Sequence, residues 1–328
     1  MTDEIKRSVW ELCKDARPLR LSRPLEERLG SIRLNLIALG DVGATLLLGL
    51  RLLGGDILAS IGIFDVNKNV VRRYELEMNQ IGWPFGCRPL PRVEAVSEEK
   101  LFDCDMLVFC ASRSVPPVGA QGDVRMMQLD ANAKLAAHYG RLAAEAGFDG
   151  IFAVVSDPVD PLCKEVLLAS GLPAGQVRGY GLGVMNKRAE YYAGLEDRFS
   201  SYLTEGRAFG PHGGDLVIAN SIENYDDELS RELTKLTVEA NLAVRELGFK
   251  PYLAPAISSG AASLLLTLAG EWHYSSVYLG CGSEGAFLGI KNRICRGEVQ
   301  IEDLPLPQKL YVRIEKAYRN LCALERRG

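Results

Sequence analysis

The chain has 328 residues, a formal net charge of -4 at pH 7 and 47% hydrophobic residues. This balance is typical of a globular protein with room for two domains, and it offers no basic surface for nucleic acid. Arginine and glycine interrupt the longest apolar run, so we expect no membrane partner. The eight cysteines form no C-x-x-C pair and no export signal opens the chain, which indicates a cytoplasmic protein with reduced thiols and no metal site.

Residues 1–30 differ in composition from the rest of the chain. They mix acids with bases and offer Trp10 and Leu12 as their only obvious apolar anchors before two prolines. We interpret them as an N-terminal arm that docks on a neighbouring subunit or on the flank of the next domain. A disordered arm is the alternative.

A strand, a tight turn and a helix are predicted directly after the arm. The apolar run 32–39 ends in a turn that contains Gly40 and Gly43, and the apolar stretch 42–53 continues at helical length. Glycines at such a turn let backbone N–H groups approach a pyrophosphate, which the helix N-terminus also favours. Ala38 stands where the G-x-G-x-x-G pattern has its first glycine, so an ordinary packing turn is the alternative.

An acid completes the dinucleotide pattern. A second apolar strand over 59–64 finishes at Asp65, 25 residues after Gly40, where this fold needs a carboxylate for the ribose hydroxyls. An acid here favours NAD over NADP, because it repels a 2′-phosphate. The predicted cofactor-binding residues are Gly40, Asp41, Val42, Gly43, Asp65, Ala111, Ser112 and Ser156.

Helices and strands alternate through residue 182. We expect helices over 66–81, 123–146 and 161–170, and strands over 105–111, 151–156 and 177–181. The Pro- and Gly-rich segment 112–122 predicts a loop at the carboxyl end of a strand, where an open α/β sheet places a substrate loop. The alternation predicts an α/β fold, with a Rossmann-type doubly wound parallel sheet over residues 31–182 that binds NAD.

The pattern changes after residue 182. We expect helices over 186–203, 226–247, 258–268 and 307–325, short strands and a turn over 207–220, and strands over 273–279, 285–290 and 293–300. Residues 183–328 are therefore predicted to form a second, α+β domain that faces the substrate.

Five short motifs follow one another along the chain. They are the Gly40/Gly43 turn with Asp65, Arg125 seven residues before Asn132, Asp157-Pro158-Val159-Asp160, Val184-Met185-Asn186-Lys187-Arg188, and Gly210-Pro211-His212-Gly213-Gly214-Asp215. Their order and spacing resemble the lactate/malate dehydrogenase family from about residue 31 to the end. The resemblance implies an NAD cofactor, a small carboxylate substrate and a homodimer or homotetramer.

The resemblance also implies site roles, which suit the chemistry of reducing a 2-oxo acid. His212 would exchange the proton, and Arg188 would bind the substrate carboxylate through two hydrogen bonds. Arg125 would polarise the carbonyl when the loop closes, and Arg113 and Asn132 complete the predicted substrate-binding set. Solvated helix arginines and a histidine that merely forms a turn are the alternatives.

Two positions depart from the family pattern. Met185 stands where the family has the aspartate that orients the histidine, and a thioether cannot do this. Asp157 stands where the family has asparagine. We hypothesise that Asp157 is catalytic and either replaces the missing partner of His212 or faces an amine or iminium of the substrate.

Two other functions stay open at this point. A catalytically silent NAD-binding protein, acting as a sensor or assembly subunit, would account for the lost aspartate. An NAD- and metal-dependent glycosidase needs a Cys–His pair for its metal, and no convincing pair is present near Cys163 or His212.

Overall fold

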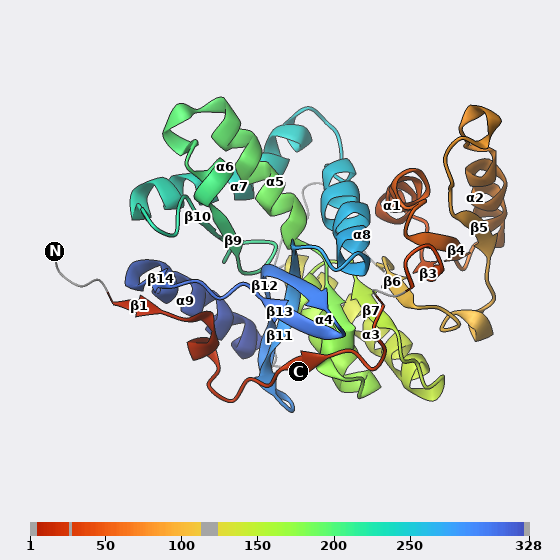
Figure 1. The fold of residues 1–328 in the computed structure, drawn as a ribbon, viewed down its shortest axis with the longest axis horizontal. Coiled ribbons are helices and arrows are strands. Elements are labelled where there is room, and N and C mark those ends of the chain that lie inside the picture. Colours follow the sequence, from red (N-terminus) through yellow and green to blue (C-terminus); the bar gives the residue numbers. More distant parts are fainter. Residues whose placement is uncertain (1–4, 26–27, 113–123, 325–328) are drawn as a thin grey trace.

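A sheet of ten strands runs through the computed structural model (Figure 1). The structure describes residues 5–25, 28–112 and 124–324, but not the side chains of residues 124–128. The strand order is β5-β4-β3-β6-β7-β8-β11-β12-β13-β2. The strands are β2 (Leu19–Arg20), β3 (Ile32–Ile37), β4 (Leu58–Phe64), β5 (Arg92–Ala95), β6 (Met106–Phe109), β7 (Ile151–Val154), β8 (Val177–Gly179), β11 (His273–Cys281), β12 (Glu284–Cys295) and β13 (Glu298–Ile301). The pairings from β5 to β8 are parallel, and those from β8 to β2 are antiparallel.

The parallel half is doubly wound. β3 pairs with β4 on one side and β6 on the other. The helices that follow these strands are α1 (Asp41–Leu53), α2 (Lys68–Gln80), α3 (Val124–Glu145) and α4 (Val159–Ser170). Every residue of β6 and β7 is buried, as in parallel strands that helices cover on both faces. The predicted α/β fold with a Rossmann-type sheet is confirmed, and such sheets bind ligands where β3 and β6 end.

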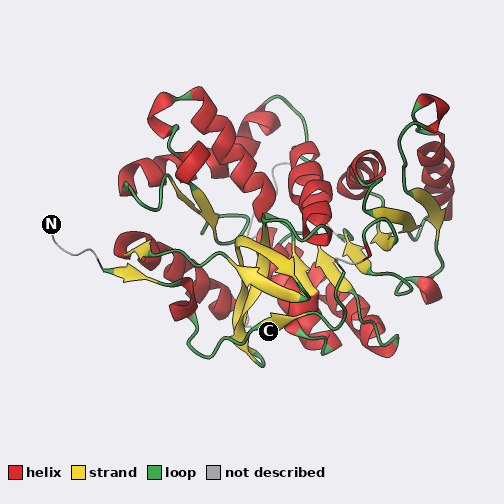
Figure 2. Cartoon of the chain, viewed as in Figure 1, coloured by secondary structure: helices red, strands yellow, loops and turns green. Residues whose placement is uncertain are grey.

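The second half continues the sheet and adds a helical part (Figure 2). Its other elements are α5 (Leu182–Leu195), α6 (Tyr202–Glu205), β9 (Arg207–Phe209), β10 (Val217–Ala219), α7 (Asp227–Glu246), the π-helix η7 (Pro255–Ala262), α8 (Ser263–Leu268) and α9 (Gln308–Leu324). β11 joins β8 with Ser276 opposite Gly179, so the sheet crosses the predicted boundary at residue 182. The division into two domains stays a prediction.

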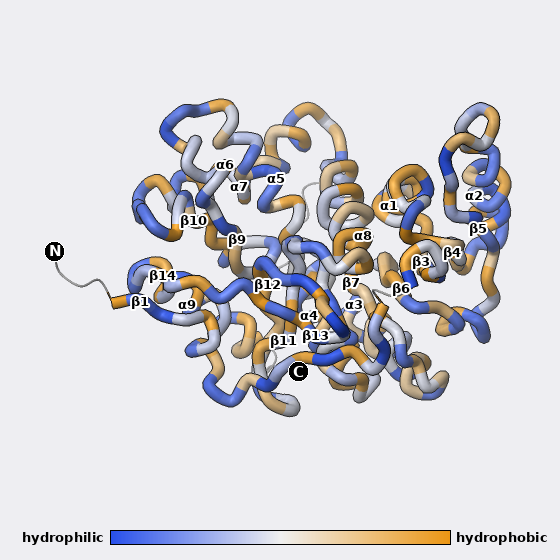
Figure 3. The backbone as a smooth tube through the Cα atoms, viewed as in Figure 1, coloured by the Kyte–Doolittle hydropathy of each residue, from blue (hydrophilic) through white to orange (hydrophobic). Residues whose placement is uncertain are grey.

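Apolar side chains divide into a large cluster along the sheet and a smaller one in the second half. Figure 3 shows mainly apolar residues in α1 and α8 and more polar ones in α2 at the outer edge. The smaller cluster lies among α5, α7 and the β9–β10 hairpin and includes Met185 and Phe199. No helix in the described ranges is both long enough and apolar enough to cross a membrane.

The N-terminal arm lies on the flank of the second half. β1 (Lys6–Arg7) pairs with β14 (Leu306–Pro307), and β2 pairs with β13. Val9 is buried, with 1% of its surface exposed. The strands of the arm pair with the second half, whereas we expected the arm on the flank of the next domain or on a neighbouring subunit, and the arm as a separate segment stays a prediction.

Several bounds of the predicted elements are wrong. The helix expected over 186–203 begins at Leu182 and ends at Leu195. It ends there because Glu196 adopts an extended backbone, which lets Phe199 and Tyr202 turn back into the smaller cluster. The helix expected over 258–268 begins three residues earlier, as a π-helix. The strands expected over 285–290 and 293–300 include one continuous strand, β12, which ends at Cys295.

Candidate active site

The turn between β3 and α1 has the geometry of a phosphate-binding loop. Ala38 has a φ of +74°, in the left-handed region that glycine adopts without strain. Gly40 is the N-cap of α1, with open space where a Cβ would stand. A Cβ on Gly43 would lie 1.9 Å from the carbonyl oxygen of Ala38, so only glycine fits there. The helix N–H groups behind this open glycine suit a pyrophosphate.

Asp65 lies beside this turn, at the carboxyl end of β4. Its carboxylate accepts hydrogen bonds from the backbone N–H of Leu39 at 2.8 Å and of Asn67 at 2.9 Å. These bonds hold the acid next to the glycine turn, in the place that suits the ribose hydroxyls of NAD. Gly40, Gly43 and Asp65 therefore come together in an arrangement that fits this cofactor.

Asp41 and Val42 begin α1, and Asp41 brings a negative charge to the same turn. Its Oδ2 forms an ion pair with Nζ of Lys250 at 3.0 Å. Lys250 lies between α7 and η7. The ammonium offsets a carboxylate that would otherwise repel a pyrophosphate. Lys250 was missed from the sequence, because 209 positions separate the two residues and no local motif marks it.

His212 and Asp157 meet although 55 positions separate them. His212 lies between β9 and β10, Asp157 follows β7, and Nδ1 of the imidazole lies 3.2 Å from Oδ1 of the carboxylate. An ionised carboxylate only accepts hydrogen bonds, so the contact suits a tautomer with the proton on Nδ1, which would leave Nε2 without a partner in the pair. The His212 side chain is 19% exposed and the Asp157 side chain 55%, so the pair opens to solvent.

Glycines hold the His212 loop close to the sheet. Gly210 has a φ of +93°, and its N–H donates to the carbonyl of Gly289 at 2.9 Å. A Cβ on Gly181, after β8, would lie 2.9 Å from the Cβ of His212. The missing side chain at residue 181 therefore lets the imidazole approach the strand ends.

Arg188 and Met185 lie one turn apart on α5 and contact each other. Nη1 of Arg188 lies 3.4 Å from Sδ of Met185. Burial lowers the pKa of the guanidinium, and Tyr192 and Asp157 oppose this. No carboxylate of the described residues forms an ion pair with Arg188. A partly buried cation without an ionic partner suits a substrate anion.

Asn132 of α3 supports Asp157. Its Nδ2 donates to the backbone carbonyl of Asp157 at 2.9 Å and to the hydroxyl of Ser112 at 3.3 Å. The hydroxyl of Ser156 donates to the carbonyl of Ala111 at 2.7 Å. These bonds tie together the ends of β6 and β7. The contacts that we predict from these residues to substrate and cofactor stay predictions.

The predicted loop arginines and the other histidines complete the set. Arg113 lies outside the described residues, and Arg125 lies in the first turn of α3 with its side chain outside them. His138 lies within α3 and His273 begins β11. Burial, with Arg178 nearby, lowers the pKa of His273 to about 3, which makes His273 a neutral structural residue.

A second carboxyl, that of Asp160, follows three residues after Asp157 and is buried. Asp160 is 3% exposed, and its Oδ1 has no hydrogen-bond partner among the described residues. Burial raises its pKa to about 7; Ser276 and His212 oppose the rise, and Asp157 adds to it. The Asp157–Asp160 motif contains this acid, but burial, which the sequence does not show, gives it its properties.

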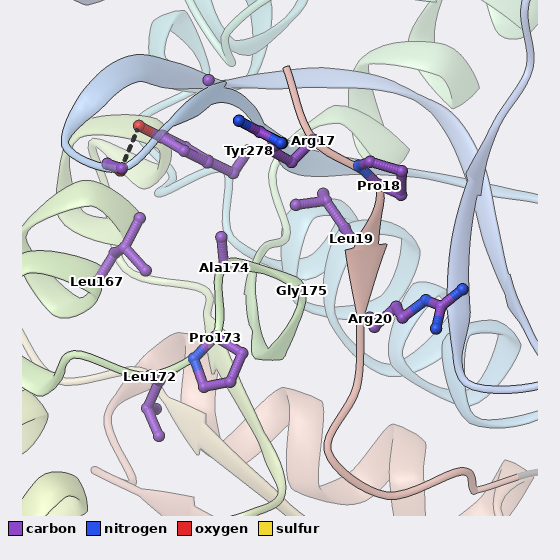
Figure 4. A pocket seen from close by; sticks show the side chains of 12 residues that line it. Arg17, Pro18, Leu19, Arg20, Leu167, Leu172, Pro173, Ala174, Gly175 and Tyr278 are labelled. Atoms are coloured by element: carbon purple, nitrogen blue, oxygen red, sulfur yellow. Dashed lines mark hydrogen bonds between the residues drawn. The ribbon is translucent and has the colours of Figure 1, made fainter. Parts of the chain in front are cut away.

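A separate hollow of about 420 Å³ lies between the arm and the segment that leads into β8 (Figure 4). The arm residues 17–20 form one wall, and residues 172–175, which precede β8, form another. None of the predicted site residues lines it. Within the described ranges, no three His, Cys, Asp or Glu side chains gather to hold a metal ion.

Comparisons with known proteins bear on the fold and the family. Residues 32–179 match the model of the lactate/malate dehydrogenase NAD binding domain. The L-lactate dehydrogenase of Treponema denticola is 30% identical over 183 residues, 55% of each chain. That of Staphylococcus epidermidis is 25% identical over 285 residues, 79% of this chain and 86% of that one. The chain covers just over half the length of the Treponema relative.

A solved structure extends the likeness in fold to almost the whole chain. The minor L-lactate dehydrogenase of Enterococcus mundtii, in its ligands-bound form, has a TM-score of 0.74 at 20% identity. The match covers 91% of this chain and 98% of that one. Residues 32–179 are thus similar in sequence to the NAD binding domain of the lactate/malate dehydrogenase family, and the chain shares the fold of that solved structure.

Proposed function

We propose that the chain is an NAD-dependent oxidoreductase that interconverts a small 2-oxo carboxylate and the corresponding 2-hydroxy carboxylate. The observation that carries the proposal is the contact of 3.2 Å between His212 Nδ1 and Asp157 Oδ1. It supplies an oriented acid–base group although Met185 replaces the usual aspartate. NAD, when bound, accepts or supplies the hydride.

We give each predicted site side chain a task in the reduction, including that of Arg125, which lies outside the described residues. Arg188 binds the substrate carboxylate and holds the carbonyl toward the imidazole. His212 donates the proton from Nε2 to the carbonyl oxygen. Asp157 keeps the ring in the required tautomer and stabilises its protonated form. Arg125 adds positive charge at the carbonyl oxygen, and oxidation of the alcohol runs the same steps in reverse.

The placement of Asp157 favours one of the two hypotheses for its role. A carboxylate in contact with the imidazole acts as the partner of His212, so a 2-oxo acid is the proposed substrate and a 2-imino acid the less favoured one. From the family we also propose that the protein works in the cytoplasm as a homodimer or homotetramer.

Turnover and binding measured side by side test the proposal. A panel of 2-oxo and 2-imino acids is offered with NADH while its absorbance is followed, and NADH binding is measured by fluorescence. Turnover of at least one 2-oxo acid supports the proposal. NADH binding without turnover of any of these substrates overturns the proposal in favour of a catalytically silent NAD-binding protein. That candidate is favoured by Met185, which stands where the family has an aspartate.

A further inference from the structure

Helix α5, which carries Met185 and Arg188, begins at a residue without a side chain to cap it. This residue is Gly181, the N-cap of the helix. Serine, threonine, aspartate and asparagine are the usual N-caps, because their oxygen accepts a hydrogen bond from a backbone N–H that the helix leaves unpaired. A Cβ on Gly181 would lie 2.9 Å from the Cβ of His212, closer than two carbon atoms normally approach. The close approach of His212 therefore excludes a capping side chain at residue 181.

Ser259 of the π-helix η7 supplies the missing cap. Its Oγ accepts a hydrogen bond from the N–H of Val184, in the first turn of α5, at 2.8 Å. The same hydroxyl donates to the carbonyl of Gly181 at 2.8 Å, so it bridges the N-cap and the first turn. Ser259 is 2% exposed. Removing its hydroxyl would leave the N–H of Val184 without this partner in a buried place, which is costly.

The first turn of α5 is shaped to receive η7. A Cβ on Gly183 would lie 2.6 Å from the carbonyl oxygen of Ser258 and 3.1 Å from Cα of Ser259, so glycine is needed for the two helices to approach this closely. Two residues earlier, Gly181 makes room for His212 instead. The start of α5 therefore contacts both η7 and the loop that carries the imidazole.

We propose that Ser259 is a positioning residue for the proposed reaction, because it fixes the start of the helix on which the placement of Arg188 and His212 depends. Arg188 lies in the second turn of α5, so fraying of the first turn moves the guanidinium that binds the substrate carboxylate. His212 packs against Gly181, so the same movement changes the position of the imidazole. A cap from η7 lets α5 start firmly at a residue that leaves room for His212.

Because this role rests on the proposed function, its test includes a readout that needs no turnover. Ser259→Ala removes both hydrogen bonds of the cap. The ring signals of His212 and the Nε–H signal of Arg188 are followed by NMR, and each is identified by its loss in His212→Gln or Arg188→Lys. The chain contains three histidines, so few ring signals need to be separated. We expect the signals of both residues to move in Ser259→Ala.

Ser263→Ala is the matched control. Ser263 is 3% exposed, and its hydroxyl donates to the carbonyl of Ser258 at 2.8 Å. Its removal costs a buried hydrogen bond to a backbone carbonyl but leaves the cap of α5 in place. We expect both variants to lower the melting temperature and only Ser259→Ala to move the signals of His212 and Arg188.

Two further variants test the two halves of the reasoning. Ser259→Cys replaces the hydroxyl by a thiol, which donates and accepts more weakly, so its signals lie between those of the wild type and Ser259→Ala. It also provides the comparison with the wild type if Ser259→Ala does not fold. Gly181→Ala adds the Cβ that the His212 loop excludes, so we expect the ring signals of His212 to move. Unchanged ring signals in Gly181→Ala contradict the reason why α5 needs its cap from η7.

Steady-state kinetics give a second reading. We expect kcat/KM for the 2-oxo acid to fall about 10- to 100-fold in Ser259→Ala, since a misplacement of about 1 Å can cost about 100-fold. The Kd of NADH stays unchanged, and Ser263→Ala keeps the wild-type kcat/KM. The positioning role is overturned if Ser259→Ala melts lower but keeps the wild-type signals, or if Ser263→Ala moves the signals equally. If the signals move as expected while no 2-oxo acid turns over, the proposed function fails and the positioning of His212 and Arg188 by Ser259 stands.

Discussion

Replacing Asp157 by asparagine tests the acid–base pair, because the change removes the charge and keeps the shape. The imidazole and carboxylate atoms lie 3.2 Å apart. At this separation two unit charges attract by about 1.3 kcal/mol with the dielectric constant of water and by about 5 kcal/mol with the value of ~20 found near protein surfaces. The Asp157 side chain is 55% exposed, so we expect about 1.3 to 3 kcal/mol.

This energy converts into a rate that is simple to measure. At about 1.4 kcal/mol for each factor of ten, Asp157→Asn lowers kcat/KM for reduction of the 2-oxo acid about 10- to 150-fold. The assay follows NADH oxidation at saturating NADH, with the Kd of NADH measured separately and expected to be unchanged. Asp215→Asn is the matched control, an acid of the β9–β10 loop that also carries His212, and it accepts a hydrogen bond from Asn320 at 3.0 Å. Wild-type kcat/KM in Asp157→Asn would refute the role given to this carboxylate.

Three other changes probe the carboxylate site, the cofactor site and stability. Arg188→Lys keeps the charge but loses the two-pronged hydrogen bonding, so we expect the KM of the substrate to rise about 10- to 100-fold at constant NADH affinity; an unchanged KM places the carboxylate elsewhere. Lys250→Ala leaves the charge of Asp41 uncompensated, so the Kd of NADH rises about threefold at low salt. Adding Asp41→Asn removes that charge and reverses the rise. A double variant that binds NADH as weakly as Lys250→Ala contradicts this explanation. Burial lowers the pKa of His273 to about 3, well below that of an unfolded chain, so stability falls as pH drops from about 6.5 toward 3. His273→Gln removes this dependence, on the order of a few kcal/mol between pH 7 and pH 4 in chemical unfolding, and equal slopes for variant and wild type argue against a buried neutral imidazole.

The parallel half of the sheet could be predicted from the sequence because its strands are buried on both faces. Continuous apolar runs, such as the one that forms β6, stand out against their polar surroundings. β5 went unpredicted, since four residues at the sheet edge, two of them charged, carry little signal. The break after Leu195 was also hidden, because Phe199 and Tyr202 keep a helical spacing and only their burial in the smaller cluster turns the chain back.

Some parts of the candidate site could likewise be predicted from the sequence, and others could not. Residues in short motifs, such as Gly43, Asp65 and His212, could be proposed from the sequence because local spacing carries the signal. The contact between His212 and Asp157 was one of two hypotheses, and the choice between them needed coordinates. Lys250 and Asp160 were missed, since one acts across 209 positions and the other acquires its chemistry from burial alone.

Because the arm pairs with β13 and β14, it can dock only after these late strands have been synthesised. Residues 6–7 and 19–20 leave the ribosome early, yet their partner strands are residues 298–299 and 306–307. The strands of the arm therefore stay unpaired until nearly the whole polypeptide has emerged. Val9 stays without its contacts to α9 until then. A chain interrupted before β13 leaves residues 292–295 of β12 without their partner strand, an open edge on which incomplete copies can pair with one another.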